Sequence, residues 1–138
     1  MLHLRVVETL HSSILPNCIL IVDDHAVIRR TLRQLFESHA GWEVCGEAVN
    51  GLDAIEKAQQ LKPDLIVLDL SMPEMDGLQA ARVLKTLLPT VPVILFTNFG
   101  EDPFIEQEAL AVGIREVVSK ANAFGLLNTV EAVLQSQE

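Results

Sequence analysis

The chain has 138 residues, a length that fits one domain able to bury a hydrophobic core without disulfides or structural metal. Hydrophobic residues make up 49% of it and charged residues 21%, which excludes an intrinsically disordered protein. The net charge of -9 argues against a nucleic acid or an anionic membrane as the main partner, because both are bound through clustered Lys and Arg.

Residues 1–16 form an N-terminal extension whose structure the sequence does not decide. His3, Arg5, Glu8 and His11 interrupt its apolar positions, so it lacks the continuous core of a signal peptide and cannot span a membrane. The pattern fits a short strand as well as a helix. A docked extension, a disordered tail and a wrongly assigned start codon are all open interpretations.

Short apolar runs alternate with amphipathic stretches along the rest of the chain. Runs rich in Val, Ile or Leu predict strands buried on both faces of a parallel sheet. In chain order, we expect strands at Ile19–Asp23, Glu43–Val49, Leu65–Asp69, Val91–Thr97 and Glu116–Ser119. Apolar residues at helical spacing predict helices at Ala26–Ser38, Leu52–Leu61, Leu78–Leu88, Pro103–Val112 and Ala123–Gln135.

Residues that favour turns and helix ends mark several of these boundaries. Asn50-Gly51 separates the second strand from its helix, and Lys62-Pro63 closes that helix. Asp76-Gly77 and Asp102-Pro103 are typical of helix N-termini, the second with proline in the first turn. Five βα units joined by right-handed crossovers therefore predict an α/β three-layer sandwich.

The two cysteines, Cys18 and Cys45, both fall in apolar strand-like runs. A thiol in such a position usually behaves as a small buried hydrophobe. The two residues could lie on neighbouring strands, but nothing else in the chain indicates an oxidising compartment. We expect them to be thiols.

Chemically active residues follow four of the predicted strands. Asp23-Asp24 ends the first run and Asp69 ends the third, while Thr97 and Lys120 come at the ends of the fourth and fifth. Parallel strands bring these ends to one edge of the sheet, where open α/β sheets place their chemistry. We therefore expect the side chains to converge.

Each residue has a simpler interpretation when it is taken alone. Asp23 and Asp24 could cap a helix, and Asp69 could form a turn. Thr97 could be an ordinary strand residue or a hydroxyl cap, and Lys120 a solvated surface charge. One site explains all of them together: clustered carboxylates hold Mg²⁺, and a carboxylate can attack phosphorus while an ammonium and a hydroxyl neutralise the developing charge.

Four segments resemble the receiver domain of two-component response regulators. They are Leu20–His25, Pro63–Gly77, Val93–Thr97 and Val118–Lys120, and the match covers roughly residues 17–134. The resemblance implies a receiver domain over residues 17–138, with a flavodoxin-like (βα)5 fold and a parallel five-stranded sheet of order 2-1-3-4-5. The Asp-Asp-His start and the stretch Gly41–Gly51 are similar to the branch usually fused to a helix-turn-helix output domain.

The resemblance also implies roles for individual residues. Asp69 would accept a phosphoryl group from a sensor histidine kinase. Asp24 would bind Mg²⁺ directly and Asp23 would assist it, often through water, while Asp69 and the backbone carbonyl of Ser71 would complete the protein's ligands. This implies a phospho-acceptor that assists its own phosphorylation and dephosphorylation, and not an enzyme.

A conformational switch is implied as well. Thr97 would bond a phosphoryl oxygen, and Lys120 would pair with the carboxylate and then with the phosphate, whose added charge is about -1.5 to -2. The loop after the fourth strand would then move. In the family this biases a face made by the helix at 103–112, the strand at 116–119 and the helix at 123–135, where a second receiver or another protein binds.

Three positions depart from the family pattern. Val117 occupies the switch-aromatic position, and a valine cannot swing inward as a ring does. Ala121 replaces the usual proline after the lysine; we expect a trans bond before it, because a cis bond to a non-proline residue costs about 2.5–4 kcal/mol. Asn98 is larger than the usual small residue after Thr97 and would narrow access to the phosphate.

Two other classes of protein can be weighed on the same residues. A degenerate receiver would bind a partner without phosphorylation, an alternative that the intact acidic set disfavours and that Val117 and Ala121 favour mildly. A magnesium-dependent phosphatase resembling the haloacid dehalogenase group needs an acid/base aspartate where Ser71 stands. We expect a cytoplasmic protein that contacts neither membrane nor nucleic acid directly; whether it is a stand-alone receiver or part of a longer regulator stays open.

Overall fold

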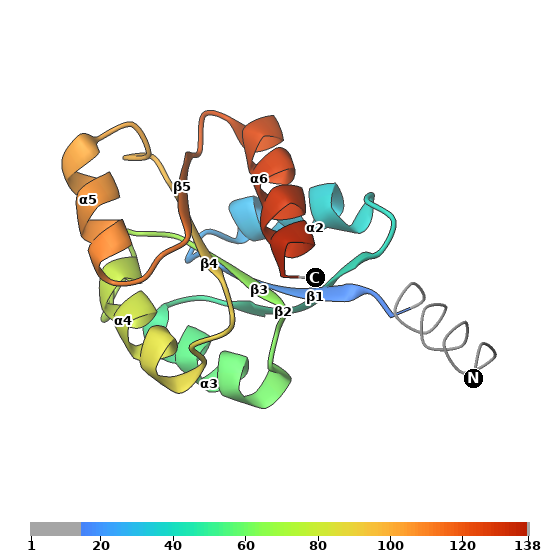
Figure 1. The fold of residues 1–138 in the computed structure, drawn as a ribbon, viewed down its shortest axis with the longest axis horizontal. Coiled ribbons are helices and arrows are strands. Elements are labelled where there is room, and N and C mark those ends of the chain that lie inside the picture. The colour runs from blue at the N-terminus through green and yellow to red at the C-terminus, as the bar shows by residue number, and fades with distance from the viewer. Residues whose placement is uncertain (1–14, 138) are drawn as a thin grey trace.

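Five parallel strands form one sheet in the order β2-β1-β3-β4-β5, the order that the resemblance implied (Figure 1). The computed structural model describes residues 15–137. The strands are β1 (Asn17–Val22), β2 (Trp42–Ala48), β3 (Leu65–Leu68), β4 (Val93–Thr97) and β5 (Glu116–Ser119). The N-terminal extension, for which the sequence left a strand and a helix open, lies almost entirely outside the described part of the chain.

Helices cover both faces of the sheet. They are α2 (Ala26–Glu37), α3 (Gly51–Leu61), α4 (Gly77–Leu87), α5 (Pro103–Ala111) and α6 (Ala123–Ser136). One hydrophobic cluster packs α2 and α6 against the sheet, and a second packs α3, α4 and α5 against the other face (Figure 1). The fold is therefore the predicted flavodoxin-like three-layer sandwich. None of the helices in the described part of the chain is both long and apolar enough to cross a bilayer.

The continuous apolar runs arise because the central strands are buried on both faces. Ile19 and Ile21 of β1 belong to the α2–α6 cluster, whereas Leu20 and Val22 belong to the other one. All four residues of β3 are buried as well. Alternate side chains of a strand point to opposite faces, so a strand between two helical layers needs apolar residues at every position.

Capping residues set the helix boundaries, as expected. The Asn50 side chain accepts a hydrogen bond from the N–H of Asp53, at the start of α3. Asp76 forms a capping box with Gln79, so two backbone N–H groups are satisfied at the start of α4. The Asp102 side chain caps α5 by accepting a hydrogen bond from the N–H of Phe104, with proline in the first turn. The Lys120–Ala121 bond is trans, as predicted, and so is every other bond described.

The prediction of two free thiols is wrong, because Cys18 and Cys45 form a disulfide with a Cα–Cα distance of 5.3 Å. The register between β1 and β2 shifts between Ile19 and Leu20, which pair with Val44 and Gly46. Cys45 therefore has no partner residue in β1 and is a β-bulge. An apolar pattern specifies which residues are buried, but it does not reveal an irregular register.

Candidate functional site

The predicted site residues meet at the carboxyl edge of the sheet. Asp23 directly follows β1, Asp69 follows β3, Thr97 ends β4 and Lys120 follows β5. These four strands are neighbours in one parallel sheet, so their ends lie beside each other. Asp23, Asp69 and Thr97 are buried, which is unusual for polar residues and indicates specific partners.

Lys120 bridges the two buried carboxylates. Its Nζ lies 2.8 Å from Asp23 Oδ2 and 3.2 Å from Asp69 Oδ1, and the lysine side chain is only 10% exposed. Burial alone would lower the pKa of Lys120, but the bonds and charges of Asp23 and Asp69 outweigh burial and raise it. Lys120 is therefore a charged member of this cluster, and the interpretation as a solvated surface lysine is excluded.

Asp69 lies in an unfavourable place for a negative charge. Burial raises the pKa of its carboxyl group, the nearby charge of Asp23 raises it further, and Lys120 and the N–H of Leu70 only partly oppose this. That N–H donates to Oδ1 at 2.9 Å, the same oxygen that Lys120 approaches. A group that neutralises the negative charge of this carboxylate would therefore stabilise it.

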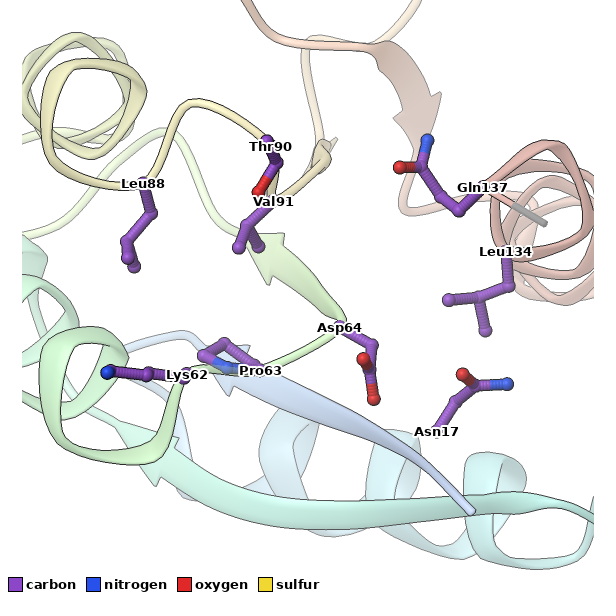
Figure 2. Close-up of a pocket in the computed structure, with 9 residues that line it drawn as sticks. All are labelled: Asn17, Lys62, Pro63, Asp64, Leu88, Thr90, Val91, Leu134 and Gln137. Atoms are coloured by element: carbon purple, nitrogen blue, oxygen red, sulfur yellow. The ribbon is translucent and has the colours of Figure 1, made fainter. Parts of the chain in front are cut away.

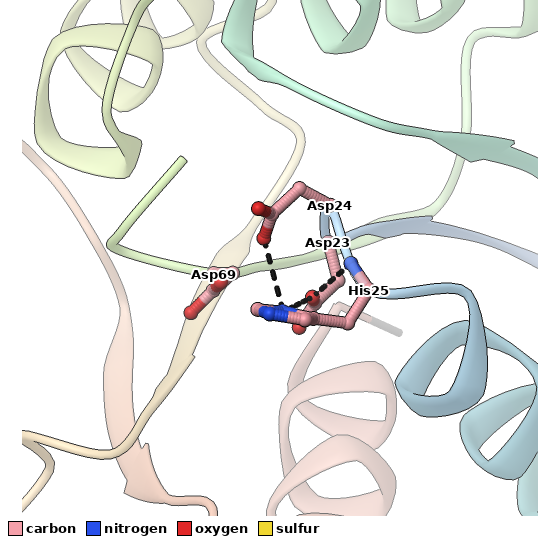
Figure 3. A group of neighbouring side chains, drawn as sticks. All are labelled: Asp23, Asp24, His25 and Asp69. Carbon is pink, nitrogen blue, oxygen red and sulfur yellow. Dashed lines mark hydrogen bonds and ion pairs between the residues drawn. The ribbon is translucent and has the colours of Figure 1, made fainter. Parts of the chain in front are cut away.

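A group of four side chains offers ligand atoms for a cation (Figure 3). Asp23, Asp24, His25 and Asp69 each place one such atom so that all lie within 4.8 Å of one another. The three carboxylates are hard oxygen donors of the kind that Mg²⁺ prefers, and their mutual repulsion favours a cation. The donor set therefore fits the predicted metal.

His25 is a member of this group that sequence reasoning missed. Its Nδ1 lies 3.2 Å from Asp23 Oδ1 and 3.1 Å from Asp24 Oδ1, and its backbone N–H also donates to Asp23. The only signal was its place directly after the acidic pair. A histidine in that position is also the N-cap residue of α2, so the sequence alone did not distinguish the two roles.

Ser71 and Asp24 line one pocket of about 520 Å³ beside the carboxylates, together with residues of the loop between β3 and α4. Ser71 is exposed there, two residues beyond Asp69. The role of its backbone carbonyl as a metal ligand stays a prediction.

The switch positions lie on the neighbouring strands. The Thr97 hydroxyl accepts a hydrogen bond from the N–H of Phe99 at 3.2 Å, and the Thr97 carbonyl accepts one from the N–H of Lys120 at 2.9 Å. Thr97 is thus tied to its own loop in this state. Asn98 is exposed in that loop, and Val117 is partly buried against the cluster that packs α3, α4 and α5.

Another pocket, of about 490 Å³, lies at the amino ends of the strands, on the side of the sheet away from the carboxyl ends (Figure 2). It is lined by residues at the starts of β1 and β3 and at the end of α6, among them Asn17, Asp64 and Gln137. The cluster of buried carboxylates and lysine is at the other edge. The chemistry of the molecule therefore points to the carboxyl edge and not to this pocket.

Comparison with known proteins agrees with this arrangement. The family model described as response regulator receiver domain matches residues 19–131. The chain belongs to this family. Chemotaxis protein CheY of Thermotoga maritima is 37% identical over 102 residues, which cover 74% of this chain and 83% of that protein.

Longer relatives contain the same domain. A protein-glutamate methylesterase/protein-glutamine glutaminase of Alkalilimnicola ehrlichii is 40% identical over 121 residues, which are 86% of this chain but 31% of the relative. The response regulator domain of Thermotoga maritima CheB has the same fold, with a TM-score of 0.82, 30% identity and coverage of 87% of this chain and 97% of that one. The chain thus spans about a third of the methylesterase relative and nearly all of the CheB domain.

Proposed function

We propose that this receiver domain accepts a phosphoryl group on Asp69 from a sensor histidine kinase, in a magnesium-dependent phosphorelay reaction. The observation that carries the proposal is the burial of the Asp69 carboxylate against the Lys120 ammonium, 3.2 Å away, inside the group of acidic ligand atoms. Phosphoryl transfer depends mainly on position and on charge neutralisation, and this arrangement supplies both.

The transfer would use the oxygen of Asp69 that its neighbours leave accessible. Leu70 and Lys120 both approach Oδ1, so Oδ2 is the oxygen we expect to attack phosphorus. The new P–O bond forms as the P–N bond of the kinase phosphohistidine breaks, and the electron pair of that bond stays on the imidazole. The product is an aspartyl phosphate, and Lys120 provides a positive charge beside it.

The metal would be held by Asp23, Asp24, Asp69 and the backbone carbonyl of Ser71. Bound Mg²⁺ supplies charge neutralisation at the phosphoryl oxygens. Asp23 has a second duty, because its Oδ2 is a partner of Lys120 at 2.8 Å. We expect this pair to keep the ammonium in the site before and after transfer.

Transmission of the signal would begin at Thr97. Its hydroxyl is bonded to the N–H of Phe99 in this structure, so reaching for a phosphoryl oxygen exchanges one bond for another and moves the loop that contains Asn98. Val117 is already partly buried and has no ring to turn inward. We propose that the loop itself, and not a rotating aromatic residue, carries the change to the face formed by α5, β5 and α6.

The remaining assignments extend the proposal. Residues 17–138 would be the receiver unit and residues 1–16 an extension to it, in a cytoplasmic protein without direct contact with membrane or nucleic acid. A second receiver or another protein would bind the face formed by α5, β5 and α6. Membership of the branch usually fused to a helix-turn-helix output domain also stays a proposal, because the relatives include CheY and CheB as well as a LuxR-family response regulator.

Incubation with acetyl phosphate and Mg²⁺, followed by intact mass measurement, tests the proposal. We expect one added phosphoryl group that is lost in Asp69→Asn and after chelation of the metal. Glu101→Gln, which removes an exposed carboxylate of the loop between β4 and α5, should be modified like the wild type. Absence of a mass increase in the wild type would favour a degenerate receiver that binds partners without phosphorylation.

A further inference from the structure

Arg29 of α2 connects β2 to the peptide that joins the metal-site aspartates. Its Nη1 donates a hydrogen bond to the backbone carbonyl of Asp23 at 2.8 Å, and its Nε pairs with Glu47 Oε1 of β2 at 3.0 Å. The side chain is 17% exposed, so water competes weakly for these bonds. The donors of a guanidinium group are fixed in one plane, so it orients two acceptors more rigidly than the rotatable ammonium of a lysine does.

The bond from Arg29 fixes the peptide group between Asp23 and Asp24. The carbonyl of Asp23 and the N–H of Asp24 lie in one planar peptide unit. The N–H of Asp23 is held on its other side by the carbonyl of Ala48, at 3.1 Å. Arg29 thus completes the fixation of the backbone from which both carboxylates project toward the cation position.

Glu47 keeps the guanidinium in this orientation. Burial would raise the pKa of Glu47, but bonds from Arg33 and Arg29 and their charges outweigh it and lower the pKa. Glu47 is therefore ionised at neutral pH and pairs with both arginines. Its other partner, Arg33, is one turn further along α2 and bonds Glu47 Oε2 at 2.8 Å.

Arg33 differs from Arg29 in one respect. Among the described residues, the side-chain partners of Arg33 are Glu47 and Glu37, and neither is part of the acidic group at the sheet edge. The two arginines share a helix, a charge and a partner. Only Arg29 reaches the peptide between the aspartates.

We propose that Arg29 is a positioning residue for the cation site, acting through the Asp23 carbonyl with Glu47 as its orienting partner. The inference rests on the proposed function, because it assigns to Arg29 the geometry of the Asp23 and Asp24 ligands. A merely structural salt bridge between α2 and β2 would give Arg29 and Arg33 equal importance for the metal. A positioning role predicts instead that, of the two arginines, only Arg29 is important for metal binding.

Calorimetric titration of the full chain with Mg²⁺ tests this, with Arg29→Gln compared to Arg33→Gln. We expect Arg29→Gln to weaken Mg²⁺ binding about 10-fold, the size seen when partners of metal ligands are removed. Arg33→Gln should leave the affinity near that of the wild type. Arg29→Lys should recover only part of the loss, since an ammonium lacks the planar, fixed donor geometry of the guanidinium.

The rate of phosphorylation by acetyl phosphate as a function of Mg²⁺ concentration gives a second readout. Arg29→Gln should need more Mg²⁺ for half-maximal rate yet approach the wild-type rate at saturation. If Arg29→Gln does not fold, Glu47→Gln takes its place in the test. This variant keeps Arg29 but removes the charge that orients it, and it should also weaken Mg²⁺ binding.

Equal affinities in the Arg29 and Arg33 variants would overturn the inference while leaving the proposed function intact. Failure of the wild type to bind Mg²⁺ would overturn both. If the wild type binds Mg²⁺ but is not phosphorylated, the proposed function fails, and the comparison of affinities still decides the role of Arg29.

Discussion

Lys120 and Asp69 form an ion pair of 3.2 Å between the ends of β5 and β3, although these strands are not neighbours in the sheet. The lysine crosses over the end of β4 to reach the carboxylate. It also bonds Asp23, so one ammonium group ties together the ends of three strands. The stability of the site and its chemistry therefore depend on the same residue.

Replacement of Lys120 by Met should lower the free energy of unfolding by about 3 kcal/mol at neutral pH without metal, because two buried carboxylates lose their cation. Added Mg²⁺ should restore part of the loss by replacing the missing charge. Urea denaturation with and without Mg²⁺ measures both effects. Lys85→Met, at an exposed position of α4, is the control and should change stability little. A loss that Mg²⁺ does not reduce would contradict this account.

Asp69 should make stability fall as pH rises through the acidic range. Its pKa is raised in the folded state, so the favourable contribution of the protonated form is complete below the ordinary value of 3.8 and is lost as pH rises through the folded value. Asp69→Asn cannot ionise and should lack this fall. The measurement is the difference in unfolding free energy between wild type and variant, without metal, from acid to neutral pH. Glu47 is present in both proteins, so its lowered pKa, which acts in the opposite direction, cancels in this difference. A constant difference would refute it.

The sequence predicted most of the fold because its signals are local or repeat at a fixed period. The buried strands β1 and β3 are continuous apolar runs, and the caps Asp76 and Asp102 mark helix starts. Asp69 and Lys120 could be placed at one edge because parallel strands end together.

Other features depend on contacts that no short pattern encodes. The Cys18–Cys45 bond depends on a bulge, and a bulge is an irregularity of register between two strands. The bond from Arg29 to the Asp23 carbonyl depends on how α2 packs beside the end of β1. Both arise from tertiary packing, which explains why they were not foreseen.

Magnesium should stabilise the folded protein through Asp23, Asp24 and Asp69. A ligand that binds only the folded state, present at 100 times its dissociation constant, adds about 2.7 kcal/mol to the unfolding free energy. We expect the melting temperature to rise by several degrees in Mg²⁺ and to return after chelation. Asp24→Asn should reduce this rise. NaCl at equal ionic strength is the control, and an equal rise in NaCl would show that charge screening alone is responsible.

Reduction of the Cys18–Cys45 disulfide should destabilise the protein without changing its fold. The bond joins residues 27 positions apart, and closing a loop of that length in the unfolded chain is worth about 3.5 kcal/mol. Urea denaturation with and without dithiothreitol should show this difference, with a steeper slope against denaturant for the reduced protein because its unfolded chain is less compact. The Cys18→Ser, Cys45→Ser double variant should have the same free energy of unfolding as the reduced wild type, and dithiothreitol should not change it. Equal stability of the oxidised and reduced wild type would mean that the bulge in β2 positions the two cysteines without their bond contributing to the fold.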